Sequence, residues 1–218
     1  LVLARPQTTN KWQNSEIEGI DIMLAIDVST SMLAEDLKPN RLEAAKDVAA
    51  EFINGRPNDN IGITLFAGET FTQCPLTVDH AVLLDMIHNI KCGLITDGTA
   101  VGMGIANAVT RLKDSKAKSK VIILLTDGTN NKGDISPMTA AEIAKSFGIR
   151  VYTIGVGTNG MAPYPYPVGN TVQYVSMPVE IDEKTLTEIA GTTDGNYFRA
   201  TSNSKLKEVY EEIDKLEK

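Results

Sequence analysis

The amino-acid sequence predicts an α/β domain with a doubly wound, mostly parallel sheet, one antiparallel edge strand and helices on both faces. Short apolar runs alternate along the chain with longer segments in which apolar residues recur at helical spacing. The runs 20–26 and 121–125 are almost entirely apolar, which indicates strands buried on both faces in the centre of a parallel sheet. Hydrophobic residues make up 42% of the 218 residues, which is enough for one ordinary globular core.

The first half of the chain contributes three strands and two helices. The first helix shows apolar residues at helical spacing and ends at Gly55. Residues 67–70, which include Gly68-Glu69, separate the second strand from the third, so these two strands are expected to form an antiparallel hairpin at one edge of the sheet. In chain order, the expected elements are strand 20–26, helix 41–54, strand 61–66, strand 71–76 and helix 79–89.

The second half continues the alternation of strands and helices. Gly148 follows a helical segment at the position where glycine commonly ends a helix. The expected elements are helix 99–112, strand 121–125, helix 138–147, strand 151–156, helix 183–190, strand 196–199 and helix 204–216.

An insert over residues 157–177 interrupts this alternation, with a short strand expected at 171–175. One interpretation is a polyproline-like excursion whose tyrosines cover a sheet edge. The other is a partner-binding rim formed by Tyr164 and Tyr166, because the insert leaves its strand at the end of the sheet where ligands bind. Its prolines and tyrosines alternate in the order Pro163, Tyr164, Pro165, Tyr166 and Pro167.

Charge and hydropathy exclude some partners and suggest an origin. The formal net charge is −7 and no long basic stretch is present, which argues against nucleic acid or an anionic membrane surface as partner. No apolar run reaches the roughly 18 residues of a membrane span. The chain begins with the apolar residues 1–4 and has no initiator Met, so we expect residues 1–19 to be a lead-in that follows a membrane anchor and residues 20–218 to be the domain.

The segment Asp27-Val28-Ser29-Thr30-Ser31 follows the first strand. Its carboxylate and two hydroxyls alternate, so that all three oxygen groups can point the same way. Hard oxygen donors of this kind can hold a Mg²⁺-like cation. Alternatively, the aspartate and serines form a turn and cap the next helix. This segment alone leaves both interpretations open.

Two further segments are expected at the same edge of the sheet, Asp97-Gly98-Thr99 and Thr126-Asp127-Gly128. Asp27 and Asp127 each follow a hydrophobic strand, and the carboxyl ends of parallel strands share the edge where ligands bind. The three segments in this order resemble the von Willebrand factor A domain and its metal-ion-dependent adhesion site. The resemblance implies that Ser29, Ser31 and Thr99 offer hydroxyls to a cation. It also implies that Asp27 and Asp127 hold the cation largely through water, with Asp97 as a less secure member.

The resemblance also implies a function. Mg²⁺ is the expected cation, with Mn²⁺ or Ca²⁺ as alternatives. Neutral hydroxyls leave the cation under-neutralised, so that it can accept the carboxylate of an Asp or Glu from a protein partner. We therefore expect a protein-interaction module and not an enzyme.

A closer resemblance is to the BatA-type proteins of bacterial aerotolerance operons. It implies membrane anchors on both sides of the domain, a periplasmic location on the inner membrane, and association with sister Bat proteins and a MoxR-type ATPase. Cys74 and Cys92 are then either free or, in an oxidising periplasm, joined as a disulfide. The segments that carry this resemblance are 4–7, 19–21, 74–77, 98–102, 197–200 and 209–218.

Two other functions match parts of the sequence but lack a residue or segment that they need. A Mg²⁺-dependent phosphohydrolase of the haloacid-dehalogenase type also ends its first strand in Asp, but it needs an acid two residues later, where this chain has Ser29. The glycines of the segment 155–160 match a dinucleotide-binding pattern, but Met161 and a proline-rich stretch follow where that mechanism requires a helix.

Overall fold

Six strands form one sheet in the order β3-β2-β1-β4-β5-β8 in the computed structural model, which describes residues 19–169 and 171–217. Every neighbouring pair is parallel except β2 and β3, which are antiparallel at the edge. The predicted mostly parallel sheet with one antiparallel edge strand is therefore confirmed. Apart from Gly19, the predicted lead-in lies outside the described residues. The strands are β1 (Asp21–Asp27), β2 (Asn60–Phe66), β3 (Thr70–Thr77), β4 (Lys120–Thr126), β5 (Arg150–Val156) and β8 (Tyr197–Ala200).

The strand order reverses between β1 and β4: β2 and β3 follow β1 on one side of it, and β4, β5 and β8 lie on its other side. β1 pairs with β2 on one side and with β4 on the other, in a register that places Ile26 beside Leu125. The carboxyl ends of β1 and β4 therefore meet at one edge, where open α/β sheets bind their ligands. Asp27 ends β1 and Asp127 directly follows β4, so the topology brings these two carboxylates to one place.

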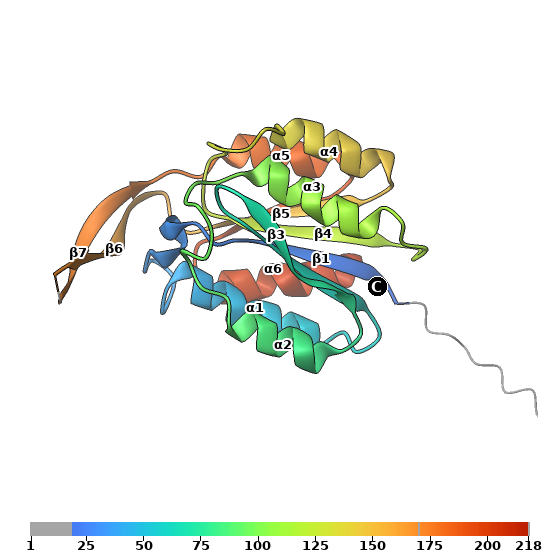
Figure 1. Cartoon of the computed structure of the whole chain (residues 1–218), viewed down its shortest axis with the longest axis horizontal. Helices are drawn as coiled ribbons and strands as arrows, with labels where there is room; N and C mark the ends of the chain where they lie inside the picture. The colour runs from blue at the N-terminus through green and yellow to red at the C-terminus, as the bar shows by residue number, and fades with distance from the viewer. Residues whose placement is uncertain (1–18, 170, 218) are drawn as a thin grey trace, which may run out of the picture.

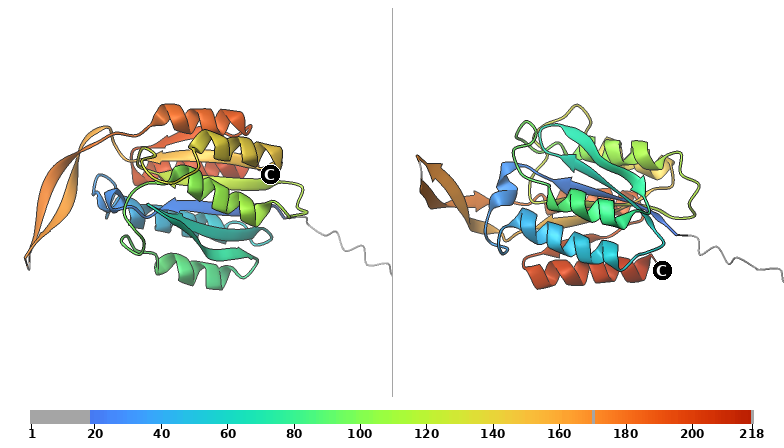
Figure 2. Two further views of the ribbon diagram at one scale, coloured as in Figure 1. Left: turned by 45° about the horizontal axis from the view of Figure 1, so that its top comes forward. Right: turned by 60° about the horizontal axis from the view of Figure 1, so that its bottom comes forward.

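Helices cover both faces of the sheet, as Figures 1 and 2 show. Successive residues of β1 serve opposite faces: Ile22 and Leu24 belong to one core, and Met23 and Ala25 to the other. All of β1 is buried, which explains why its sequence shows no polar alternation. One face carries α1 (Arg41–Asn54), α2 (His80–His88) and α6 (Asn203–Leu216), and the other carries α3 (Val101–Leu112), α4 (Pro137–Ser146) and α5 (Glu183–Thr192).

The insert is an antiparallel hairpin of β6 (Gly160–Val168) and β7 (Thr171–Val179) that forms a separate two-stranded sheet. In Figures 1 and 2 it projects as an arm beyond the end of the main sheet. The interpretation of a polyproline-like excursion covering a sheet edge is therefore wrong. The expected short strand at 171–175 is present and extends to Val179. Prolines are compatible with β6 because they occupy positions whose N–H would face away from β7.

Two local features differ from the elements expected from the sequence, one of them at the helix expected over 99–112. The helix α3 begins only at Val101, because Thr99 and Ala100 are held in a loop. The N–H of Ala100 donates to the carbonyl of Ala67 at 2.7 Å, and the N–H of Thr99 donates to Asn131 Oδ1 at 2.9 Å. A short 3₁₀ helix, η1 (Thr30–Leu33), follows β1 and was not predicted. Both features lie beside the candidate site.

Candidate metal centre

Asp27 anchors the loop that follows β1. Its side chain is fully buried, and Oδ1 accepts the N–H of Ser29 at 2.9 Å while Oδ2 accepts the hydroxyl of Thr126 at 2.6 Å. The first contact forms the local turn that belonged to one of the two interpretations of this segment. The second contact joins the ends of β1 and β4.

The hydroxyls of Ser29 and Ser31 face each other and not the backbone. Ser29 is the N-cap residue of η1, but its side chain makes no capping hydrogen bond. Its Oγ lies 2.9 Å from Ser31 Oγ, and Ser31 Oγ donates to Asp127 Oδ1 at 2.7 Å. The helix α1 is capped by Asn40, whose side chain accepts the N–H of Glu43. The interpretation of these serines as helix caps is therefore wrong.

Thr99 reaches the same place from the loop before α3. It is buried, and its carbonyl accepts the N–H of Asn131 at 2.9 Å while its own N–H donates to that residue's side chain. A Cβ added at Gly128 would lie 3.2 Å from Thr99 Oγ1, so the hydroxyl of Thr99 lies close to the residue after Asp127. The three predicted segments thus converge, and Gly128 leaves open the space beside this hydroxyl.

Asp97 supports the loop from outside the cluster. Its Oδ1 accepts the N–H of Thr30 at 3.0 Å, and its Oδ2 accepts the hydroxyl of Thr30 at 2.9 Å. Partial burial opposes ionisation, but these hydrogen bonds outweigh it and lower the pKa of Asp97. Asp97 therefore fixes the residue between the two serines.

The electrostatics of the cluster favour a cation. Burial, together with the charge of nearby Asp127, raises the pKa of Asp27 to about 7. Burial also raises the pKa of Asp127, although the guanidinium of Arg41 works in the opposite direction. Burial and mutual repulsion make it unfavourable for both carboxylates to be ionised. A divalent cation bound between them would offset this repulsion and favour the ionised forms.

Arg41 and Asp36 complete the site and were missed in the sequence. Arg41 is fully buried and forms ion pairs with Asp127 at 2.7 Å and with Asp36 at 2.6 Å. Asp36 also accepts the N–H and the hydroxyl of Thr158, which precedes the hairpin. Burial opposes ionisation of Asp36, but the bonds from Arg41 and Thr158 outweigh it and lower its pKa to about 2. A cation in the first turn of a helix opposes the helix dipole, and this was the available signal for Arg41.

The donor chemistry fits a hard cation. The described residues contain no group of three or more His, Cys, Asp or Glu side chains that could hold a metal. The cluster instead combines two carboxylates with three hydroxyls, all of them oxygen donors of the kind that Mg²⁺ and Ca²⁺ prefer. The cluster contains no nitrogen or sulfur ligand, the kinds of donor that softer metals prefer.

The remaining residues singled out in the sequence lie outside the cluster. Tyr164 is half-buried and Tyr166 is exposed, both on β6. Cys74 and Cys92 are free, so the disulfide expected as one alternative is not formed in this structure. Both pack against the same core, and burial with nearby negative charge raises the pKa of Cys92 to about 12. Neither sulfur is therefore a ready thiolate.

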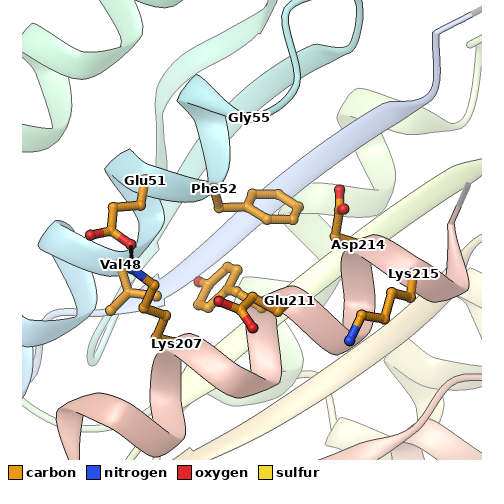
Figure 3. A pocket seen from close by; sticks show the side chains of 9 residues that line it. Val48, Glu51, Phe52, Gly55, Lys207, Glu211, Asp214 and Lys215 are labelled. Carbon is orange, nitrogen blue, oxygen red and sulfur yellow. Dashed lines mark ion pairs between the residues drawn. The ribbon is translucent and has the colours of Figure 1, made fainter.

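A pocket of about 400 Å³ lies between α1 and α6, apart from this cluster. Figure 3 shows Glu51 and Phe52 on one side and Lys207 on the other, with an ion pair of 2.7 Å between Lys207 and Glu51. The α1 residues that line it come from the second half of that helix, whereas Arg41 is its first residue. The pocket is therefore not part of the metal centre.

Comparison with known proteins agrees with the fold. A model of the von Willebrand factor type A domain matches residues 21–212. An aerotolerance-related membrane protein of Bacteroides fragilis is 32% identical, with a TM-score of 0.79 over 90% of this chain and 98% of that one. BatB of Bacteroides thetaiotaomicron is 34% identical, with a TM-score of 0.79 over 91% and 98%.

A curated relative, an uncharacterized protein of Borreliella burgdorferi, is 29% identical over 99% of this chain. The chain covers 58–64% of the length of the first curated relatives that it matches. Among the described residues, no helix is both long and apolar enough to cross a membrane.

Proposed function

The chain belongs to the von Willebrand factor type A domain family, and from this premise we propose that it is a metal-dependent protein-interaction module and not an enzyme. Its centre would hold one divalent cation, and the cation would accept the carboxylate of an Asp or Glu from a protein partner. The residues that would hold the cation are Asp27, Ser29, Ser31, Thr99 and Asp127.

The observation that supports this proposal most is how the charge of the cluster is balanced. Three of the five donors are neutral hydroxyls, and Asp127 already shares its charge with buried Arg41 at 2.7 Å. A divalent cation among these donors would keep positive charge toward an open coordination position. An incoming carboxylate could supply the missing negative charge.

Mg²⁺ is our preferred cation, with Mn²⁺ and Ca²⁺ as alternatives. All the donors are hard oxygens, and Mg²⁺ commonly binds through few protein ligands while keeping several waters. Fully buried Asp27, which accepts hydrogen bonds through both oxygens, suits a role of holding such waters.

We further propose Tyr164 and Tyr166 as part of the partner-binding surface. They lie on the hairpin, which begins shortly after Thr158, a residue that donates a hydrogen bond to Asp36. The hairpin leaves the sheet at the end that carries the metal centre (Figure 1). Tyrosine is favoured in such surfaces because it offers a large apolar area and a hydroxyl.

The setting of the whole protein is also a proposal. Its solved relatives include an aerotolerance-related membrane protein and BatB. We propose that this domain faces the periplasm from an anchor in the bacterial inner membrane and works with sister Bat proteins and a MoxR-type ATPase.

Calorimetry with MgCl₂ tests the centre. Wild type should bind Mg²⁺, Asp27→Ala should not, and Asp47→Ala should bind like wild type, because it removes an equal charge from the exposed face of α1. A pull-down from envelope extract, with and without chelator, then tests partner capture by the same three proteins. Equal Mg²⁺ affinity in all three would refute the site. Mg²⁺-dependent release of phosphate from a generic phosphoester, lost in Asp27→Ala, would favour an enzyme instead.

A further inference from the structure

The hairpin β6–β7 is an uncharged arm with exposed apolar side chains. Residues 160–179 contain no Asp, Glu, Lys, Arg or His, although the whole chain has a net charge of −7. Soluble surfaces seldom leave so much apolar area uncovered unless it binds something. The exposed side chains include Met161, Tyr166, Val168, Val172, Tyr174, Val175 and Met177.

The outer edge of β6 is closed by proline. Pro163 and Pro165 lie opposite Ser176 and Tyr174 in the hairpin register, and Pro167 follows the same alternation. Because proline has no N–H, these must be the non-hydrogen-bonded pairs, whose backbone groups face away from the partner strand. The carbonyl of Pro163 indeed accepts the N–H of Glu35, outside the hairpin, at 2.8 Å. This edge offers no N–H groups at three successive outward positions.

The outer edge of β7 is open. The same register turns the N–H and carbonyl groups of Val172, Tyr174 and Ser176 away from β6. In the described part of the chain, none of these three N–H groups donates to another backbone carbonyl, and all three residues are exposed. The next outward position is Pro178, which ends the edge. Charged side chains, bulges and covering segments normally protect such edges, and β7 carries no charge.

We propose that β7 pairs antiparallel with β7 of a second copy of this chain, with the twofold axis beside Tyr174. Tyr174 then pairs with its counterpart, and Val172 of each copy pairs with Ser176 of the other. Each hydrogen-bonded antiparallel pair exchanges two bonds, so the three pairs form roughly six bonds. The inference goes beyond the proposed function and does not depend on the metal.

Two features favour a second copy as the occupant. The open edge has its outward positions arranged symmetrically about Tyr174, so it complements itself in a twofold arrangement. Residues 160–179 contain no charged side chain, so the paired strands place no like charges of their own opposite one another. The resulting four-stranded sheet would end at a proline edge of β6 on both sides. Assembly would therefore stop at two copies.

Sedimentation velocity between about 5 µM and about 500 µM, with chelator present, tests the proposal, because the short edge predicts weak, concentration-dependent association. Wild type should move from 23.6 kDa toward twice that mass as concentration rises. The double variant V172P/S176P removes the N–H donors of both outer pairs, and its dimerisation constant should weaken at least tenfold. The matched control V172A/S176A keeps those donors and should stay within about threefold of wild type.

Far-UV circular dichroism and urea unfolding establish that each variant is folded. A wild type that stays monomeric throughout, or a dimer that V172P/S176P leaves unchanged, would overturn the proposal. A third variant, P165T/P167T, restores donors on the outer edge of β6 and should form species larger than the dimer. If it stops at the dimer, the proline edge does not close the assembly.

Discussion

Arg41 and Asp127 form a buried ion pair of 2.7 Å in which neither side chain is exposed to solvent. The same guanidinium contacts Asp36 through Nε at 2.7 Å and through Nη2 at 2.6 Å, and Asp36 binds Thr158 at the base of the hairpin. One chain of contacts therefore connects the candidate metal centre to the projecting arm. Its members can be changed one at a time.

Asp27→Asn should abolish Mg²⁺ binding while keeping the fold. The amide has the shape of the carboxyl and removes a buried charge that is repelled by Asp127, so the metal-free variant should be at least as stable as wild type. Mg²⁺ at a hundredfold excess over its dissociation constant should stabilise wild type by about 2.7 kcal/mol and leave the variant unchanged. Thermal unfolding with and without MgCl₂ measures both effects. An equal rise of the melting temperature in both proteins would contradict the assignment of Asp27.

Thr99→Val and Thr99→Ser separate the hydroxyl of Thr99 from its shape. Valine keeps the volume of this buried side chain but removes the oxygen, so Mg²⁺ affinity should fall by roughly tenfold or more. Serine keeps the oxygen and should bind within about threefold of wild type. Calorimetry on the two variants measures the difference. Equal affinity in both would remove Thr99 from the centre.

The stability contributed by Asp36 should depend on pH in the acid range. Its pKa is lowered to about 2 by Arg41 and Thr158, which outweigh burial. A carboxyl with a lowered pKa stabilises the fold fully above its unfolded value near 4, and this contribution is lost as the pH falls toward 2. Urea unfolding of chelated wild type and Asp36→Asn should therefore give a stability gap that is constant from pH 5 to 7 and narrows below pH 4. A gap independent of pH down to 2.5 would show that the Asp36 charge does not matter.

Much of the site follows from the sequence because it depends on where strands end. Asp27, Ser31 and Asp127 can be brought together from the pattern alone, since parallel strands that are adjacent in the sheet place their carboxyl ends at one edge. Arg41 could not be placed in this way. It begins a helix, where a charged residue is ordinarily solvated, and it becomes buried only because Asp127 and Asp36 approach it from separate segments.

The hairpin could not be predicted for a related reason. Alternating prolines normally exclude a strand, and the sequence does not reveal that all of them fall on outward-facing positions. The register depends on the partner strand β7, which contains only one proline. Pairing with β7 therefore makes β6 a strand although the local sequence disfavours one.

Gly157→Ala should disrupt the link between the centre and the arm. Gly157 has φ of +117°, and an added Cβ would lie 2.5 Å from Arg41 Cζ, with the guanidinium held on both sides by carboxylates. The substitution should lower the free energy of unfolding by about 3 kcal/mol or more, because backbone strain adds to displacement of a buried ion pair. Chemical denaturation measures this loss.

Gly160→Ala is the matched control for that substitution. Gly160 has a similar φ of +110°, but an added Cβ would meet nothing within 4 Å. It should therefore show the strain alone, about 1–2 kcal/mol. The difference between the two variants isolates the contact with Arg41, and Mg²⁺ affinity should fall in Gly157→Ala but not in Gly160→Ala, because only the former displaces the partner of Asp127. Equal losses of stability and unchanged Mg²⁺ affinity in both would show that the guanidinium can move aside freely and does not link the centre to the arm.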